Sequence, residues 1–507
     1  MGLALALAAG AWAQEKPQEP QNGVKAQPDK KTAPTHITPE QAKQLFRSVD
    51  ELIKFASEET GLPVKHEVKR TLTTRVEVEK YLVEKFNDDE DSKRMQRGEI
   101  VLKKFGLLDR DFDLKPFMLA LLKEQIAGYY DSKTKTVYLL DWIDPETQKP
   151  VLVHELTHAL QDQHTDLEKW NNQTPSEVSH NTSEDNEHLI KDEYDTAREA
   201  AVEGQAMVVY LDYALKPSGR SIIKDPEVVD QIGDGGGDAD SPVLARAPLL
   251  LSESLLFPYK DGLSFEQDVW MDKGRAAAFS GVLDRPPAST WEVINPRVYE
   301  QGKQSPVLVM PDIHKLLDVK YKPYDVGQVG QLDLRILAQI FGGESAAREL
   351  TPAWDGGIYW AGQALSAKTA KEQASTKSIA LMYLSAWKSE ASARSFAHMY
   401  AEQLGRKYSG VKLDTADKSD TVDGQEVIYT TDEGTVVITT RGKYVFTAES
   451  FDLATARKLT TLLIDGQGTG ELRTAENRKG TTAEPGLTGS WVRFMHACGM
   501  MKAGMWK

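Results

Sequence analysis

The chain has 507 residues, of which 40% are hydrophobic and 27% charged, a balance typical of folded globular proteins. At roughly 150 residues per domain, this length allows about two to four domains. The 61 lysines and arginines face 76 aspartates and glutamates, and the net charge of −15 argues against binding nucleic acid. The single cysteine, Cys498, excludes an internal disulfide and a multi-cysteine zinc or iron–sulfur site. Beyond the N-terminus, no apolar run reaches the ~18–20 residues that span a bilayer.

The N-terminal segment differs in composition from the rest of the chain. An apolar stretch over residues 2–10 leads into Ala11-Trp12-Ala13, an A-x-A-like cleavage site, although no basic residue precedes it. We therefore expect a signal peptide over residues 1–13 and a secreted or periplasmic protein. The alternative is a frayed apolar N-terminus of a cytosolic protein. Residues 14–37 are rich in Pro, Gln and Lys and predict a flexible linker.

In chain order, residues 38–366 predict mainly helices with a few strands. Thr38 followed by Pro39 is typical of a helix start. Alternation predicts a strand over 64–73, and two apolar runs around a polar turn predict a β-hairpin over 128–141. Pro145 and Pro150 predict a short loop between them. Two further loops are expected, one over the polar stretch 165–187 and a flexible one over 234–242. The expected helices cover 38–59, 75–86, 92–105, 113–125, 151–164 and 189–215, and a mainly helical region follows the break up to about residue 364.

From residue 378 the pattern changes to alternating strands and helices. Strands are expected over 379–387, 425–431, 435–440 and 443–449, and helices over 391–408 and 453–463. We therefore expect an α+β protein with a main domain over 38–366 and a small α+β domain over 377–468. The tail, residues 469–507, has no assignable role.

One motif within the main domain indicates chemistry. His154-Glu155-Leu156-Thr157-His158 is an HExxH sequence inside a helical window. Residues four apart lie on one helix face, so both imidazoles can reach one ion. Glu155 beside them can accept a proton from a water that the ion activates. The hairpin before the motif offers an edge strand that an extended peptide can pair with. The alternative is a solvated helix face with two ordinary histidines.

A catalytic zinc ion takes three protein ligands, and three residues compete to be the third. His164 has the spacing of HExxHxxxxxH, but Gln161 stands where that motif needs a glycine to turn the chain. If the helix continues, His164 lies about 15 Å further along its axis. Glu203 lies on the next long helix, beside Gly204, which allows another helix to approach closely. We favour Glu203 over Glu199, one turn earlier, and either over His164.

These residues resemble the gluzincin family of zinc peptidases. His154 to His158 is identical to the motif of the thermolysin group, and Val202-Glu203-Gly204-Gln205-Ala206 resembles the ligand segment of the aminopeptidase gluzincins. The resemblance, specific over 128–206, extends to secreted bacterial and archaeal peptidase-MA-like proteins. It implies a zincin-like domain with a small mixed sheet, an active-site helix and a mainly helical second lobe. It also implies one Zn2+ held by His154, His158 and Glu203, with Glu155 as general base. The Gly-rich exopeptidase motif is missing, which argues against an aminopeptidase.

Several other residues have weaker assignments. Asp162 could orient His158, and Tyr299 is our choice for stabilising the oxyanion. His164, His180 and His188 could form a second metal site, although ordinary loop histidines are the simpler interpretation. A calcium site at Asp234, Asp238 and Asp240 fits no EF-hand spacing, so we favour a plain linker there.

The sequence therefore predicts a zinc-dependent metallopeptidase, most simply an endopeptidase, acting on a peptide or protein substrate. The expected partners include no nucleic acid, no transmembrane segment is expected in the mature chain, and the oligomeric state is open. Two alternatives remain. One is a zinc-binding but proteolytically inactive secreted or envelope protein that acts through its C-terminal domain. The other is a metzincin-like peptidase that uses His164 as the third ligand.

Overall fold

The fold is described from a computed structural model of the chain. It describes residues 37–88, 90–125, 128–171, 179–229, 241–415 and 426–468, together with 472, 473 and 487. The expected signal peptide, nearly all of the linker and most of the tail lie outside these residues. Within the described residues, no helix is both long and apolar enough to cross a membrane.

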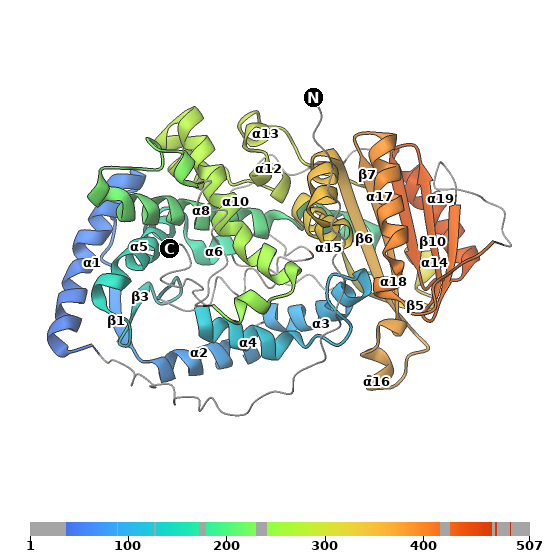
Figure 1. Ribbon diagram of the computed structural model, residues 1–507, viewed down its shortest axis with the longest axis horizontal. Helices are drawn as coiled ribbons and strands as arrows, with labels where there is room; N and C mark the ends of the chain where they lie inside the picture. Colours follow the sequence, from blue (N-terminus) through green and yellow to red (C-terminus); the bar gives the residue numbers. More distant parts are fainter. Residues whose placement is uncertain are drawn as a thin grey trace, which may run out of the picture. The chain divides into compact units, whose positions relative to one another are not determined.

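The described chain is an α+β structure in which helices predominate up to residue 317 and a large sheet follows (Figure 1). Several of the helices before that sheet pack against α8 and α10, among them α1, α5, α11, α12 and α13. Their bounds are α1 (Pro39–Thr60), α2 (Arg75–Asp88), α3 (Glu90–Phe105), α4 (Leu114–Gln125), α5 (Pro145–Thr165), α6 (Leu167–Asn171), α7 (Thr182–Lys191), α8 (Tyr194–Leu215), α10 (Leu249–Lys273), α11 (Val282–Asp284), α12 (Thr290–Ile294), α13 (Pro296–Glu300) and α14 (His314–Leu317).

Local sequence explains where the first helices start and stop. Thr38 caps α1 by accepting from the Gln41 amide, with Pro39 in the first turn, and Gly61 ends the helix at φ +74°. The expected helix start at Val151 is wrong, because Asp144 caps α5 and Pro145 opens it, so Pro150 lies inside the helix. The expected loop over 165–187 is also wrong in part, since α6 and the first half of α7 occupy it. The expected long helix 189–215 is broken between α7 and α8.

A small sheet lies beside α5. It has three strands, β1 (Lys69–Thr73), β2 (Tyr129–Asp131) and β3 (Thr136–Leu140), in the order β1-β3-β2. The hairpin of β2 and β3 is the one that the sequence predicts, and β1 pairs with β3 in parallel. Tyr129 stacks on Tyr138 across the hairpin, with ring centroids 4.4 Å apart. The sheet is therefore mixed, with β2 at one edge.

The large sheet has seven strands, all antiparallel, in the order β5-β6-β7-β11-β10-β9-β8. The expectation of a mainly helical region up to residue 364 is wrong at β5 and β6, whose glycines and Pro323 resemble turn signals in the sequence. The C-terminal strands agree with the expected ones. The remaining elements are β4 (Pro306–Val307), β5 (Tyr321–Gln328), α15 (Gln331–Leu350), β6 (Trp354–Ala364), α16 (Ala370–Gln373), β7 (Ile379–Trp387), α17 (Glu390–Glu402), α18 (Leu404–Lys407), β8 (Lys412–Leu413), β9 (Glu426–Thr431), β10 (Gly434–Arg441), β11 (Tyr444–Glu449), α19 (Leu453–Gly466) and β12 (Leu472–Arg473).

Both faces of the large sheet are covered. Alternate residues of β7 belong to two different cores, with Tyr383 in one and Met382 in the other. Phe396 of α17 lies in the first core and Leu459 of α19 in the second, so the two helices cover opposite faces. The first core continues without a break into the helices of the N-terminal part. The expected boundary at 366–377 therefore falls between β6 and β7, two neighbouring strands of one sheet.

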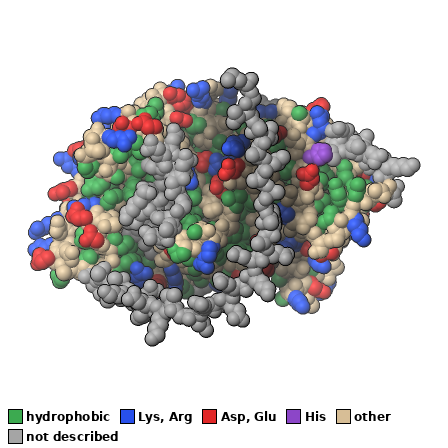
Figure 2. Space-filling view, in the orientation of Figure 1, with side chains coloured by type: hydrophobic (Ala, Val, Ile, Leu, Met, Phe, Trp, Pro, Cys, Tyr) green, Lys and Arg blue, Asp and Glu red, His purple; other side chains and the backbone are tan. Residues whose placement is uncertain are grey.

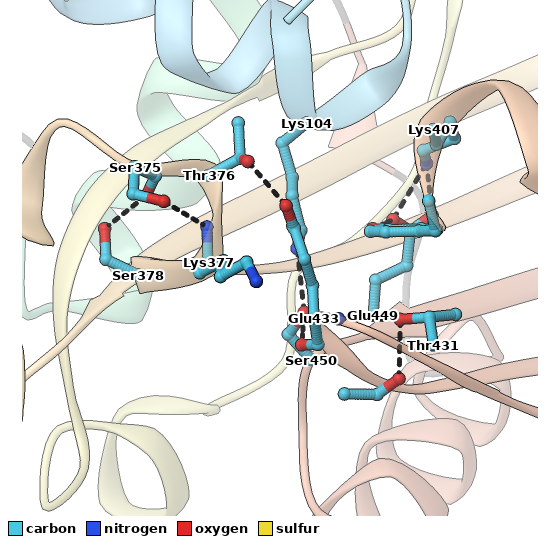
Figure 3. A network of polar contacts seen from close by, with 12 residues as sticks. Lys104, Ser375, Thr376, Lys377, Ser378, Lys407, Thr431, Glu433, Glu449 and Ser450 are labelled. Atoms are coloured by element: carbon cyan, nitrogen blue, oxygen red, sulfur yellow. Dashed lines mark hydrogen bonds and ion pairs between the residues drawn. The ribbon is translucent and has the colours of Figure 1, made fainter. Parts of the chain in front are cut away.

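Buried charges connect α3 to the turn between β9 and β10 and to the end of β11 (Figure 3). Lys104 of α3 donates to Glu433 and to Ser450 at 2.8 and 2.7 Å. Lys407 lies 2.6 Å from Glu449, and both side chains are fully buried. Burial lowers the pKa of Lys407 to about 8. Burial alone would raise the pKa of Glu449, but the charges of Lys407 and Lys104 outweigh it and lower that pKa. The bonds of Lys104 fix α3 against the sheet, and the pair of Lys407 and Glu449 fixes α18 against β11.

The surface mixes charges of both signs. Figure 2 shows Lys and Arg interspersed with Asp and Glu over the described part of the face that it draws. The net charge of −15 is thus not gathered into a single patch on that face.

Candidate metal centre

Two buried helices, α5 and α8, bring the HExxH motif and Glu203 together. His154 and His158 lie one turn apart on α5, and Glu203 lies in the middle of α8, which packs along α5. His154, Glu155, His158 and Glu203 are each at most 5% exposed. The motif therefore does not lie on a solvated helix face, and the interpretation as two ordinary surface histidines is wrong.

The three expected ligands point at one another. The Nε2 atoms of His154 and His158 are 3.0 Å apart. Glu203 Oε2 lies 3.0 Å from the first and 3.7 Å from the second. Three such donor atoms around one tetrahedral zinc ion, at bond lengths of 2.0–2.1 Å, would be separated by about 3.3 Å. Two imidazoles and one carboxylate are also a donor set that zinc accepts, so the residues present fit the ion.

Comparison with known protein families, with curated proteins and with solved structures finds no match for this chain. The site is therefore argued from its own geometry.

A relay of two glutamines fixes the protonation of His158. Gln205 of α8 donates through its amide nitrogen to the carbonyls of Ala278 and Phe279, at 2.8 and 3.1 Å. Gln161 in turn donates to Val202 O at 2.9 Å and to Gln205 Oε1 at 3.0 Å. The Gln161 oxygen is left as an acceptor, and it lies 2.8 Å from His158 Nδ1, which must therefore carry the proton. His158 Nε2 then presents its lone pair to the centre.

The relay ends on an unusual turn of helix. Ala278 and Phe279 belong to the π-helical turn Ala277–Gly281. A π-helical turn shifts its backbone hydrogen bonds by one residue, and such turns recur at functional sites. In the sequence, Gln161 stands out only as the residue in place of the metzincin glycine. Gln161 follows His158 by three residues, so the two side chains lie on the same side of α5. This spacing is the sequence signal that could predict a contact between them.

Asp162 does not take the role that the sequence suggested for it. Its carboxylate accepts from the Tyr130 hydroxyl at 2.6 Å, from Lys135 Nζ at 2.9 Å and from the Leu167 amide at 3.0 Å. These contacts attach the hairpin β2–β3 and the start of α6 to the end of α5. Asp162 thus holds the small sheet against α5, and the residue that orients His158 is Gln161 instead.

Glu155 reaches the edge strand of the small sheet. Its Oε2 accepts from the backbone amide of Tyr130 in β2 at 2.8 Å. Tyr130 pairs with Val137 of β3 on its other side. The amide that an added peptide strand would use at this position is therefore already bonded to Glu155, which differs from the freely available edge that the sequence predicts. The same bond fixes the carboxylate beside the three ligands.

A close helix crossing brings a tyrosine to the centre. Gly204 of α8 packs against Gly262 of α10, where a Cβ on Gly204 would lie 2.2 Å from the Gly262 carbonyl oxygen. One turn before Gly262, the Tyr259 ring lies 6.4 Å from that of His154, centroid to centroid, at 26°. Burial raises the pKa of Tyr259 well above 10, helped by the charges of Glu203, Glu199 and Glu155 and by a hydrogen bond to Glu203. Tyr259 thus stays a neutral hydrogen-bond donor beside the ligands.

Three other residues that the sequence suggested for this site lie elsewhere or play another part. α5 continues to Thr165, and His164 pairs with Asp284 of α11 at 3.3 Å, away from the ligand group. Glu199 is buried on α8 but is not one of the three converging ligands. Tyr299 donates its hydroxyl to the Arg285 carbonyl at 2.7 Å.

The second metal site suggested for three histidines does not form, and the calcium site is not tested. His164, His180 and His188 do not come together, because His188 pairs with Asp192 at 3.2 Å and His180 with Asp318 at 2.7 Å. Asp234, Asp238 and Asp240 lie outside the described residues.

Proposed function

We propose that the protein is a zinc-dependent metallopeptidase with a zincin-like catalytic region formed by α5, α8, α10 and the small sheet. In this proposal His154, His158 and Glu203 hold one zinc ion and Glu155 is the general base. The observation that supports it is the convergence of the three donor atoms, with Glu155 next to His154 on the same helix. The substrate is a peptide or protein. The apolar stretch over 2–10 and the A-x-A sequence at 11–13 support an action outside the cytoplasm.

Each residue has a defined task in peptide hydrolysis. Zinc, when bound, polarises the scissile carbonyl and makes water a better nucleophile. Glu155, fixed by the Tyr130 amide, takes the proton of the attacking water and passes it to the leaving amine. Gln161 keeps His158 in the tautomer that presents Nε2. Tyr259 donates to Glu203 and keeps that carboxylate oriented.

A second candidate is a zinc-binding protein without proteolytic activity. The burial of all four residues and the bond from Tyr130 to Glu155 favour it, because a substrate needs access to the carboxylate. The presence of Glu155 favours the enzyme, since a purely structural zinc site has no need for a carboxylate at that position.

A peptide digestion separates the two candidates. A defined peptide library is incubated with the zinc-loaded full chain and cleavage is read by mass spectrometry, with Glu155→Gln as the blank. The enzyme is expected to cleave, and the blank is expected to bind zinc equally well without cleaving. Zinc binding without cleavage by the unmodified chain would overturn the peptidase and favour the binding protein.

Zinc affinity tests the ligand set independently of activity. Glu203→Gln is expected to weaken zinc binding strongly, because it removes the anionic ligand. His164→Ala is the matched control and is expected to leave the affinity unchanged. Weaker zinc binding in His164→Ala, with unchanged binding in Glu203→Gln, would favour the metzincin-like peptidase with His164 as the third ligand.

A further inference from the structure

A second group of side chains that could hold a metal ion lies where the segment before α7 meets α14. His180 Nδ1 is 2.7 Å from Asp318 Oδ2, and His314 Nδ1 is 3.4 Å from Asp318 Oδ1. The donor atoms of the three residues lie within 4.8 Å of one another. His314 and Asp318 are four residues apart, at the start and just past the end of α14, so both face the same side of the helix. None of the three belongs to the HExxH centre.

A buried carboxylate prepares His314 for coordination. Asp185 of α7, 1% exposed, accepts from His314 Nε2 at 2.8 Å. Ser179 Oγ lies 3.2 Å from the other Asp185 oxygen and helps to orient it. Because Nε2 is the nitrogen in this bond, Nδ1 is the ring nitrogen that faces Asp318 and that could coordinate an ion. A carboxylate behind a histidine, with the other ring nitrogen facing the ion, is a recurring arrangement at zinc sites.

The two parts of this group are held together without any ion. Asn186 of α7 makes a double hydrogen bond with the backbone of Met310, donating to its carbonyl at 2.8 Å and accepting from its amide at 2.9 Å. This pair fixes α7 next to the segment that leads into α14. Only His180 is free to adjust, since its side chain is 61% exposed. To coordinate an ion, its Nδ1 would have to move from 2.7 Å to about 3.3 Å from the Asp318 oxygen, the spacing of tetrahedral ligands.

We propose that His180, His314 and Asp318 form a second metal site, which binds Zn2+ or a similar divalent transition metal ion. Two imidazoles with one carboxylate favour such ions over Mg2+ and Ca2+, which prefer oxygen ligands alone. The site has three protein ligands and a fourth position for water. Binding would attach His180, which comes just before the N-cap of α7, to α14. It would thereby join α7, which leads into α8, to α14, which leads into the large sheet at β5. The competing interpretation is a surface ion pair between His180 and Asp318.

Zinc stoichiometry tests this site. The full chain is equilibrated with buffered Zn2+, unbound metal is removed, and zinc per chain is measured by mass spectrometry and by calorimetric titration. Two zinc ions are expected in the unmodified protein and one in His180→Ala, which removes an exposed side chain and leaves the buried Asp185–His314 pair intact. His164→Ala, another histidine that pairs with a single carboxylate, is the control and is expected to keep both ions.

A second background makes the result independent of the HExxH centre. His158→Ala is expected to retain one zinc ion, and the double variant with His180→Ala none. Zinc is also expected to raise the melting temperature of His158→Ala but not of the double variant. If His180→Ala binds as much zinc as the unmodified chain, the second site is wrong, whatever happens at the first. If His180→Ala binds less zinc than the unmodified chain but His158→Ala binds as much, the second site is supported and the HExxH proposal is wrong.

Discussion

His158 Nδ1 donates to Gln161 Oε1 across 2.8 Å within α5, and this one contact links the candidate metal centre to two other helices. Gln161 is completely buried and is itself held by Val202 and Gln205 of α8. Gln205 continues the relay to the π-helical turn Ala277–Gly281. The orientation of a ligand on α5 thus depends on the correct packing of α8 and of the turn beyond it.

Replacing Gln161 is expected to weaken zinc binding without unfolding the protein. Gln161→Leu keeps a side chain of similar size but removes the acceptor for His158 Nδ1, so that the ring is no longer held in one tautomer. Loss of such a partner typically costs about 10- to 100-fold in metal affinity. Competition against a chelator of known affinity measures the change. Gln163→Leu is the control, because the side chain of Gln163 bonds to the backbone of residues 65 and 66. Equal affinities for both variants would contradict the relay.

Tyr259 is expected to support zinc binding by orienting Glu203, whereas Tyr299 is expected to have no effect on zinc binding. Tyr259→Phe keeps the ring against His154 and removes the hydroxyl that donates to Glu203. Zinc affinity is expected to fall by about tenfold, while kcat of the zinc-saturated protein changes little. Tyr299→Phe removes a hydroxyl that bonds to Arg285, a contact that contributes about 1 kcal/mol to stability, and zinc affinity is expected to stay unchanged. A fall in kcat with unchanged affinity in Tyr259→Phe would show that the phenol acts on the substrate instead.

The crossing of α8 and α10 is expected to tolerate no side chain at Gly204. A methyl group there would lie 2.2 Å from the Gly262 carbonyl oxygen, so Gly204→Ala must push the helices apart. Such overpacking costs about 1–3 kcal/mol, and it also moves Tyr259 away from Glu203. Gly98→Ala on α3 is the control, because nothing lies within 4 Å of its new methyl group and alanine favours the helix. Urea unfolding should show a loss of stability only in Gly204→Ala, and a stable Gly204→Ala would contradict the close crossing.

The parts of this protein that could be predicted from its sequence are those set by local spacing. The positions of His154 and His158 on one helix face, and the hairpin before them, follow from periodicity and turn residues. The choice of Glu203 over His164 needed only the observation that no glycine breaks α5. The roles of Gln161 and Tyr259 depend on carbonyls and carboxylates that other helices supply, and no local pattern encodes these.

The large sheet shows a second reason why local sequence patterns fail to predict parts of the fold. β5 and β6 contain Pro323, Gly356 and Gly357, which are turn signals in isolation. In the fold, Gly357 is needed because a Cβ there would lie 2.8 Å from the Val329 carbonyl oxygen. Close packing between distant segments thus selects a residue that the local pattern assigns to a turn. The buried pair of Lys407 and Glu449 is similar, since each charge has a partner only after the sheet and α18 have come together.

The stability of the protein is expected to fall as the pH rises from about 4.5 to 8, because of Glu193 at the start of α8. Burial and the charges of Asp333 and Asp192 raise the pKa of Glu193 to about 8, against an ordinary value of 4.5, although Thr290 donates two hydrogen bonds to it. Between these two values the folded state holds a proton that the unfolded state has lost, so stability is greatest at the acid end. Glu193→Gln resembles the protonated acid and is expected to make this dependence weaker, becoming more stable than the unmodified chain near pH 8. Part of the slope is expected to remain, because burial also raises the pKa of Asp212 to about 7. Urea unfolding across this range measures both proteins, with Glu344→Gln, an exposed residue of α15, as the control. A slope in Glu193→Gln as steep as that of the unmodified chain would show that other groups cause the fall in stability.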